Sequence, residues 1–531
     1  MKNKRQSFLH GAAVLAVTVA IVKVLGAIYK IPLGNLLGPT GYGYFNKAYS
    51  IFSIMLTLST AGLPVAMSRL VAKADAEGNR PRIREIFVTA QSLFFAFGAI
   101  ATVVMFLFSG QIAEKMDSPE VAYAIAALSP SVLLVCLTSS YRGYAQGHSS
   151  MTPTAVSQVI ETLGKLIFGL GFAWYFVSNS YELQYSSAGA IFGVTIGSLL
   201  ALIYMIFAVK VEKTPIAKDE RAKSGEVLKQ LLMIGIPVTL GVLPQAIVAL
   251  FDSFIITPRL AAGGWDHVDA RFGVFSQVQT LFNIPASFIV PITVSVIPAI
   301  AARLAAKSRD GAAKVTNTAL KLSTLLAFPA GVGLSVLSQP ILSVVYNLSD
   351  STEYAGITAD GTGLLAILGI ASFFTCTTLV TNAILQAYGF ERVPVYTMII
   401  GGVLKVAGTY FLTPIIGIRG AAIGTLSSFA LISILNIVIL FVRAKIKPDT
   451  AIVRIFIAGA IMGIIAYAAA NFAGAFNADL SRMRILFALV IAIGLAIIAY
   501  AAMVLGLRII RKDDLEFLPK GDKLAKVLRI R

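Results

Sequence analysis

The chain has 531 residues, of which 57% are hydrophobic and only 13% are charged, and its formal net charge is +18. A soluble globular protein is nearer half apolar and a quarter charged, so the composition excludes an ordinary soluble enzyme. The basic residues fall mainly on alternate loops between apolar runs, so we expect a membrane topology signal and not a nucleic-acid partner. Because many of these runs reach about 20 residues, which is enough to cross a bilayer, the sequence predicts an all-α polytopic membrane protein.

The apolar runs predict fourteen transmembrane helices. They lie at about 10–32, 44–68, 86–110, 121–145, 153–178, 187–209, 230–256, 272–300, 317–345, 362–388, 393–413, 418–442, 451–472 and 484–507. In membrane proteins, cytoplasmic loops carry an excess of Lys and Arg. In this chain the predicted loops with that excess lie on the same side as both termini, so we expect both termini in the cytoplasm. The first run follows Lys2, Lys4 and Arg5 but lacks a small-residue cleavage site, so we interpret it as a retained helix and not as a signal peptide.

An internal repeat runs through the chain. The block from Pro64 to Lys73 (PVAMSRLVAK) returns at 298–307 (PAIAARLAAK), with Pro, Arg, Leu, Ala and Lys at the same spacing. A second echo, YGYF at 42–45 and FGVF at 272–275, keeps a similar offset. Six predicted spans separate the copies, and an even number returns the chain to the same side of the membrane. The repeat is therefore parallel, as in transporters that rock one half against the other.

The repeat divides the chain into predicted regions. They are an N-terminal lobe of six spans (1–210), a cytoplasmic linker (211–229), a C-terminal lobe of six spans (230–447), two further helices (448–507) and a basic cytoplasmic tail (508–531). We interpret the tail as an anchor against anionic lipid, with a partner-binding segment as the alternative.

The usual signatures of enzymes and metal proteins do not occur in the sequence. Cys136 and Cys376 lie inside apolar spans and are expected to be packing residues, not a disulfide. His10, His148 and His267 are scattered without metal-ligand spacing. There is also no phosphate-binding Gly-x-x-x-x-Gly-Lys-Ser/Thr motif and no nucleophile–base arrangement. We therefore expect neither catalysis nor a cofactor.

Charged residues inside the predicted spans are the candidate functional residues, because a charge in the bilayer is costly unless it faces a cavity or a partner. The candidates are Lys23, Lys30, Lys47, Glu161, Lys165, Asp252, Arg271 and Lys405. Glu161 and Lys165 stand at i and i+4, where they can pair. Lys405 corresponds to Lys165 across the repeat but has Gly401 one turn earlier. Together the lysines indicate a central cationic cavity for an anionic substrate, since Lys is a point-charge ligand for phosphate.

Several of these positions have a second interpretation. Lys30, Lys47 and Arg271 lie near the ends of spans, where a long side chain also reaches water or pairs with a distant residue. Asp252 either pairs with a cation of the protein or binds a coupling ion, Na⁺ or H⁺. The uncharged, glycine-rich segment 32–43 is interpreted either as a mobile outer gate or as an ordinary flexible loop.

The stretch from Tyr141 to Glu161 (YRGYAQGHSSMTPTAVSQVIE) is the most distinctive motif. It resembles the Arg-Gly-x-x-Gln-Gly…Met-x-Pro…Ser-Gln…Glu pattern of the SpoVB/YtgP-like proteins. These are relatives of the MurJ lipid II flippases in the multidrug/oligosaccharidyl-lipid/polysaccharide (MOP) exporter superfamily. The KVLG element at 23–26 resembles part of their first helix, and the segment 62–72 resembles the end of their second.

The resemblance implies a bacterial plasma-membrane flippase for an undecaprenyl-pyrophosphate-linked saccharide, above all the peptidoglycan precursor lipid II. It also implies a lipid-tail groove along the last two helices, with membrane lipids and cell-wall synthesis proteins as further candidate partners. Lys23 is then the first position expected to bind the pyrophosphate, and Asp252 falls where family members carry an acidic residue. The sequence departs from the MurJ pattern in having Lys at position 23 in place of Arg, and Tyr29-Lys30 in place of an Arg-Asp pair.

Three other functions remain as alternatives. Export of another polyprenyl-linked saccharide, such as a capsular, teichuronic or spore-cortex unit, would use the same pyrophosphate ligands. A drug/cation antiporter would favour an acidic cavity, against which the excess of lysine argues. A non-transporting scaffold of cell-wall synthesis would have no need of buried charges.

Overall fold

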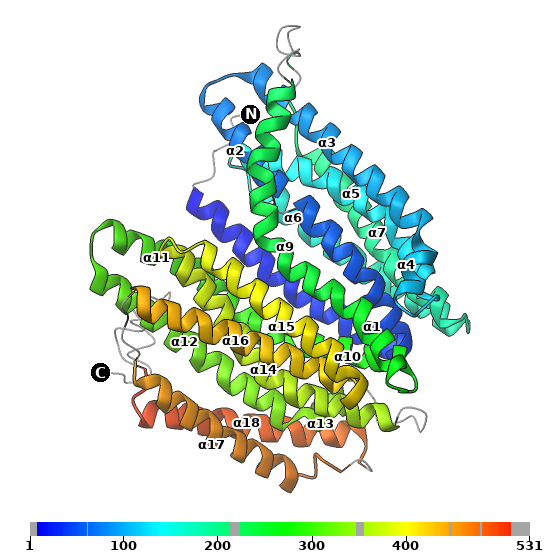
Figure 1. Ribbon diagram of the computed structural model, residues 1–531, viewed down its shortest axis with the longest axis vertical. Helices are drawn as coiled ribbons and strands as arrows, with labels where there is room; N and C mark the ends of the chain where they lie inside the picture. The colour runs from blue at the N-terminus through cyan, green and yellow to red at the C-terminus, as the bar shows by residue number, and fades with distance from the viewer. Residues whose placement is uncertain are drawn as a thin grey trace. The chain divides into compact units, whose positions relative to one another are not determined.

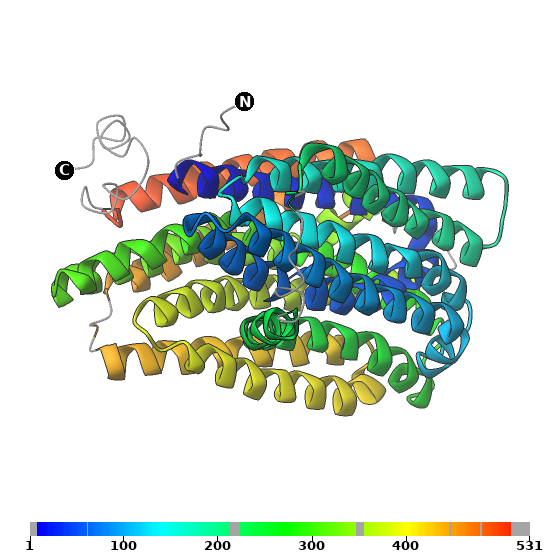
Figure 2. The ribbon, with the colours of Figure 1, turned by 90° about the horizontal axis from the view of Figure 1, so that it is seen from above.

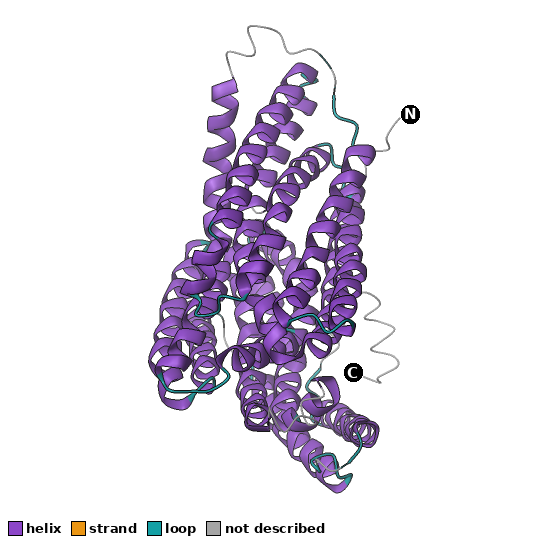
Figure 3. Cartoon of the chain, turned by 90° about the vertical axis from the view of Figure 1, so that its right-hand side faces the viewer, coloured by secondary structure: helices purple, strands orange, loops and turns teal. Residues whose placement is uncertain are grey.

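The structure is a computed structural model that describes residues 8–510, except 61, 213, 215–223, 347–354, 445, 447–448 and 478–479. All regular secondary structure in these residues is α-helical, and Figure 3 shows helices joined by loops. The chain divides into two compact units, Met1–Gln277 and Val278–Arg531. Most of the predicted linker and nearly all of the predicted tail lie outside the described residues, so the predicted region boundaries stay predictions.

The N-terminal unit is a helical bundle. Its helices are α1 (Phe8–Thr60), α2 (Gly62–Ala76), α3 (Arg80–Leu107), α4 (Ser109–Lys115), α5 (Val121–Gly147), α6 (Thr152–Ser178), α7 (Leu183–Ala208), α9 (Ser224–Ala262) and the first part of α10 (Val268–Phe282). Helix α6 packs along α7, and α5 packs against α1, α3 and α7 (Figure 1, Figure 2).

The C-terminal unit is a second helical bundle. Its helices are α11 (Ile284–Ala305), α12 (Arg309–Val336), α13 (Ser338–Tyr346), α14 (Ala355–Ala387), α15 (Arg392–Ile416), α16 (Arg419–Ala444), α17 (Ala451–Phe472) and α18 (Arg482–Gly506). Helix α14 packs against α11, α12 and α16, while α15 packs along α16 and α17 along α18. The pairs α6–α7 and α15–α16 therefore recur in corresponding places of the two units.

The described residues contain twelve helical stretches that are long and apolar enough to cross a membrane. This confirms an all-helical, multi-pass membrane protein. The number differs from the fourteen predicted spans for two reasons. The predicted spans 10–32 and 44–68 fall in one of the twelve stretches, Val17–Ala76, and the predicted span 230–256 lies in α9, which is not among the twelve.

Helix α1 contains a kink in the segment that the sequence suggested as a gate or loop. Segment 32–43 is helical on both sides of a kink at Gly38, whose backbone angles are φ 65° and ψ 179°. Glycine adopts this conformation without the steric penalty of a side chain, and Pro39 follows as a residue that begins a new helical turn readily. A glycine–proline pair thus joins two helices at a kink. The segment is helical on both sides of Gly38 and is not an ordinary flexible loop, while its role as an outer gate stays a prediction.

The repeat also appears in how two corresponding helices begin. After the first PVAMSRLVAK-type block, the Asn79 side chain accepts a hydrogen bond from the backbone N–H of Arg82 at 3.0 Å. After the second block, Ser308 Oγ accepts from the backbone N–H of Gly311 at 3.3 Å. Asn and Ser are preferred at these N-cap positions because they satisfy backbone donors that the helix leaves unbonded. The duplicated block is therefore followed by the same turn-and-cap device in each unit.

The interior of each unit is closely packed. Tyr29, Phe45 and Phe94 are almost completely buried in the N-terminal unit. Helices surrounded by lipid associate mainly through such van der Waals packing, since lipid tails are themselves apolar. Cys136 and Cys376 are buried and free, which confirms that they are packing residues.

Candidate functional site

A polar cavity lies within the N-terminal unit among helices α1, α2, α5 and α6. Its volume is about 380 Å³. Its polar lining consists of Lys23, Tyr49, Thr60, Ser139, Arg142, Gln146, Thr154, Gln158, Glu161, Thr162 and Lys165. The structure thus brings three of the predicted site residues, Lys23, Glu161 and Lys165, into the wall of one cavity.

Two helix faces supply most of this polar wall. On α5, Ser139, Arg142 and Gln146 stand at i, i+3 and i+7. On α6, a second row of polar residues, also spaced three or four apart, runs from Thr154 to Lys165. Residues at this spacing lie on one face of an α-helix. The polar residues therefore form two facing stripes in otherwise apolar helices, and the stripes follow from helical periodicity.

Arg142 is the main functional candidate that was not predicted. It is 8% exposed, its Nη2 donates to Glu161 Oε2 at 2.8 Å, and its Nε donates to Ser157 Oγ at 2.9 Å. Glu161 therefore pairs with Arg142 on the neighbouring helix and not with Lys165 on its own helix. Arg142 stands in the YRGYAQG motif, which stands out in the sequence for its family resemblance and not as a charged site.

Lys165 is held by aromatic rings. Its Nζ lies 5.8 Å from the ring centre of Tyr29 and 5.9 Å from that of Tyr49. Lys30 Nζ lies 5.6 Å from the same Tyr49 ring, although Lys30 is not among the residues that line the cavity. A cation is attracted to the face of an aromatic ring within about 6 Å. The rings position Lys165 without neutralising its charge.

The charged residues of the cavity wall carry a net positive charge. They are three cations, Lys23, Arg142 and Lys165, and one carboxylate, Glu161, which gives a net charge of 3 − 1 = +2. Arg142 and Glu161 neutralise each other at 2.8 Å. Lys23, which is exposed, and Lys165, which is partly exposed, are thus the cations available to a ligand.

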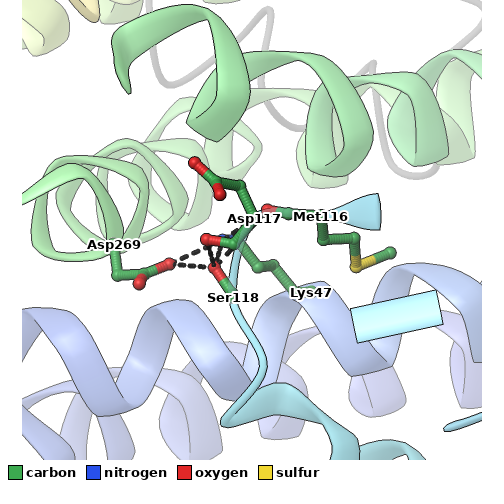
Figure 4. Close-up of polar contacts among 5 residues, drawn as sticks. All are labelled: Lys47, Met116, Asp117, Ser118 and Asp269. Atoms are coloured by element: carbon green, nitrogen blue, oxygen red, sulfur yellow. Dashed lines mark hydrogen bonds and ion pairs between the residues drawn. The ribbon is translucent and has the colours of Figure 1, made fainter. Parts of the chain in front are cut away.

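Lys47 does not belong to this cavity. Its side chain is 0% exposed, and its Nζ lies 2.6 Å from Asp269 Oδ1 at the start of α10. It also donates to Ser118 Oγ (Figure 4). Its Nζ lies 5.2 Å from the ring centre of Phe272. The structure therefore supports the alternative interpretation of Lys47 as one half of a buried ion pair. Sequence could not identify the partner, because 222 residues separate the two.

The other predicted residues lie elsewhere. Arg271 Nε donates to the backbone oxygen of Asp266 at 2.8 Å, and its guanidinium lies 5.0 Å from the ring centre of Trp265, at the α9–α10 connection. Asp252 is buried in α9 and Lys405 is buried in α15, each 6% exposed. Their roles in ion coupling and substrate binding stay predictions.

The C-terminal unit contains an apolar groove of about 570 Å³. Its walls come from α11, α12, α17 and α18, with the start of α13, and include Phe288, Pro329, Gly333, Met462 and Ile497. Tyr500 also lines it, and the Tyr500 hydroxyl donates to the backbone oxygen of Leu325 at 2.9 Å. The last two helices thus form part of a surface suited to an apolar chain.

Comparison with known proteins agrees with this architecture. The family model described as "Polysaccharide biosynthesis protein" matches residues 8–303, and the MatE model matches residues 269–411. The chain is 26% identical to stage V sporulation protein B of Bacillus subtilis, with 97% of this chain and 98% of that protein covered. It is also 26% identical to the lipid II flippase MurJ of Bacillus subtilis, with 78% and 79% covered.

A solved structure shares the fold. The structure of the lipid II flippase MurJ in an inward closed conformation matches with a TM-score of 0.69 at 15% identity, over 93% of this chain and 99% of that one. At this identity the match establishes the fold alone. Because the first family model covers more than half of the chain, this protein belongs to the polysaccharide biosynthesis protein family.

Proposed function

We propose that this protein is a transporter that moves a polyprenyl-pyrophosphate-linked saccharide from the inner to the outer leaflet by alternating access, with lipid II as the first candidate substrate. The observation that carries the proposal is the net positive cavity, in which Lys23 and Lys165 remain available to an anion while Glu161 is neutralised. A pyrophosphate is a compact anion that lysines bind well as point charges.

The apolar groove supports the same substrate class. A lipid-linked saccharide has a polar head and a long apolar tail, and the protein offers a polar cavity in one unit and an apolar groove of about 570 Å³ in the other. A drug or metabolic anion would use the cavity but would have no need of the groove. A cation antiporter would need an acidic cavity, whereas the single carboxylate among the cavity residues is bonded to Arg142.

The relatives favour lipid II and one alternative. Similarity to the lipid II flippase MurJ of Bacillus subtilis supports the peptidoglycan precursor. Similarity to stage V sporulation protein B extends over 97% of the chain, against 78% for that MurJ, and favours a second candidate, a polyprenyl-linked saccharide of the spore envelope. Both candidates share the pyrophosphate that the cavity lysines would bind.

The proposed membrane arrangement completes the transport cycle. If α1 counts as two helices at the Gly38 kink and α9 counts as a further crossing, the twelve stretches become fourteen spans. These make two six-helix lobes in parallel repeat and two C-terminal helices, with both termini cytoplasmic as the basic loops indicate. The head group enters from the cytoplasmic side while the tail stays in lipid, and the membrane potential or an ion gradient resets the empty carrier.

Complementation tests the proposal. The wild-type chain, expressed in a bacterium depleted of its lipid II flippase, is expected to restore growth and lipid II in the outer leaflet. The Lys165→Gln variant should not restore either, whereas Lys73→Gln should, because the Lys73 side chain is 75% exposed on the surface. Failure of well-expressed wild-type protein to expose lipid II would contradict lipid II as the substrate and favour the second candidate.

A further inference from the structure

Three polar atoms in the cavity wall have no hydrogen-bond partner within the part of the chain that the structure describes. They are Ser139 Oγ on α5 and Thr154 Oγ1 and Gln158 Oε1 on α6. Ser139 is 1% exposed and Thr154 is 2% exposed. Buried polar atoms are bonded in nearly all native structures, so three exceptions in one cavity wall require an explanation.

Neighbouring hydroxyl groups on the same two helices are bonded. Ser140, one residue after Ser139, donates to Gln91 Oε1 at 2.8 Å. Ser157, one residue before Gln158, donates to the backbone oxygen of Thr154 at 2.8 Å and accepts from Arg142. The helices therefore satisfy polar groups beside the three atoms, and what the three atoms share is their place in the cavity wall. This placement indicates that their partner is a ligand in the cavity.

The polar row on α6 changes character along the helix. It begins with the neutral Thr154 and Gln158, continues with the paired Glu161, and ends at the cationic Lys165. Because an α-helix rises 1.5 Å per residue, the first and last of these positions are about 16 Å apart along the axis. The row on α6 thus has a neutral polar end and a cationic end, with Glu161, which is paired to Arg142, between them.

The chemistry of Gln158 distinguishes the two ends. Its Oε1 is an acceptor and needs a donor, and an ionised pyrophosphate has acceptor oxygens only. Saccharide hydroxyl and amide groups supply both donors and acceptors, so they satisfy the Gln158 amide oxygen and also the Ser139 and Thr154 hydroxyls. A ligand that bonds all three atoms therefore carries O–H or N–H groups.

We propose that Ser139, Thr154 and Gln158 form a saccharide subsite, separate from the pyrophosphate subsite at Lys165. This inference rests on the proposed function. It orients the substrate along α6, with the sugar toward Thr154 and Gln158 and the pyrophosphate toward the aromatic-flanked Lys165. It also makes these three residues determinants of which head group the transporter accepts.

Binding measurements on the purified full-length protein in lipid nanodiscs test the subsite. Two probes are compared, undecaprenyl pyrophosphate without a sugar and lipid II. Gln158→Leu is expected to weaken lipid II binding about tenfold, the effect of one hydrogen bond, and to leave undecaprenyl pyrophosphate within about twofold of wild type. The double variant Ser139→Ala/Thr154→Val should behave in the same way. Lys165→Gln should weaken both probes.

Two controls separate recognition from folding. Ser140→Ala removes a neighbouring hydroxyl that is bonded to Gln91 and should change neither affinity. Gln158→Leu replaces an unbonded buried acceptor by an apolar group of similar shape, so the ligand-free variant should melt at or above the wild-type temperature. A residue needed only for packing would not combine unchanged thermal stability with a selective loss of lipid II binding.

The outcomes are distinguishable. Equal losses for both probes, or no loss for lipid II, in Gln158→Leu and in the double variant would overturn the subsite while leaving the proposed function intact. Failure of the wild-type protein to bind either probe would overturn the proposed function, and the subsite with it.

Discussion

Gly43 on α1 and Gly273 on α10 lie in direct backbone contact. A Cβ atom on Gly43 would lie 2.7 Å from the backbone oxygen of Asp269 and 3.3 Å from the backbone nitrogen of Gly273. These are the glycines of the repeated YGYF and FGVF segments, so two copies of one motif meet each other. The Lys47–Asp269 ion pair and a hydrogen bond from Gln277 Nε2 to Gly34 O at 3.1 Å reinforce the same contact between the helices.

Substitution of Gly273 is expected to force this contact apart. In Gly273→Ala the new methyl group would overlap the backbone of Pro39, and such overpacking costs about 1–3 kcal/mol. Thermal unfolding in detergent should show a lower melting temperature. Gly26→Ala on the same α1 helix is the matched control, because nothing lies within 4 Å of its Cβ position. Equal melting temperatures for the two variants would contradict the close approach.

The Lys47–Asp269 pair is expected to be structural. In Lys47→Met the Asp269 carboxylate, whose side chain is 19% exposed, loses its cation, and breaking a buried pair in this way costs about 3–5 kcal/mol. The double variant Lys47→Met/Asp269→Leu should recover much of that stability, since an apolar pair replaces an ionic one. A double-mutant cycle of melting temperatures measures this coupling. Loss of substrate binding in Lys47→Met with wild-type stability would instead assign Lys47 to the substrate site.

The cavity lysines are expected to act on binding and not on folding. Lys23→Gln and Lys165→Gln should each reduce the affinity for undecaprenyl pyrophosphate about tenfold or more, because each loses a charge-assisted contact. Their melting temperatures should stay near that of the wild type, since neither residue makes an ion pair within 4 Å in the described part of the chain. Lys73→Gln, at a 75% exposed side chain, is the control and should bind normally. Unchanged affinity in both cavity variants would exclude this cavity as the anion site.

The apolar groove is expected to discriminate by chain length. Gly333 lines the groove and has nothing within 4 Å of its Cβ position, so Gly333→Trp would place an indole ring in the groove without disturbing the backbone. Binding of the 55-carbon prenyl pyrophosphate should weaken several-fold, whereas a short-chain prenyl pyrophosphate should bind as it does to the wild type. Gly333→Ala should change neither affinity. Equal losses for long and short chains would show that the groove does not hold the tail.

Much of this architecture was predictable because it depends on local properties of the chain. Hydropathy predicted a multi-pass helical protein, since a backbone in lipid must satisfy its hydrogen bonds within each helix. The cost of charge in the bilayer identified Lys23, Glu161 and Lys165, and all three line the same cavity. The repeat was readable because corresponding helices keep corresponding sequence.

Partnerships between helices were not predictable. The partner of Lys47 stands 222 residues away in the sequence. Glu161 pairs with Arg142 on the neighbouring helix, although Lys165 stands only one turn further along the same helix as Glu161. The two glycine motifs are likewise neighbours only because α1, bent at Gly38, packs against α10. The sequence by itself determined which segments are helices and which of them carry charge at membrane depth, because spacing and hydropathy are properties of each segment alone. The tertiary structure alone decided which charges neutralise each other and which remain available to a substrate, because that depends on how the faces of separate helices pack.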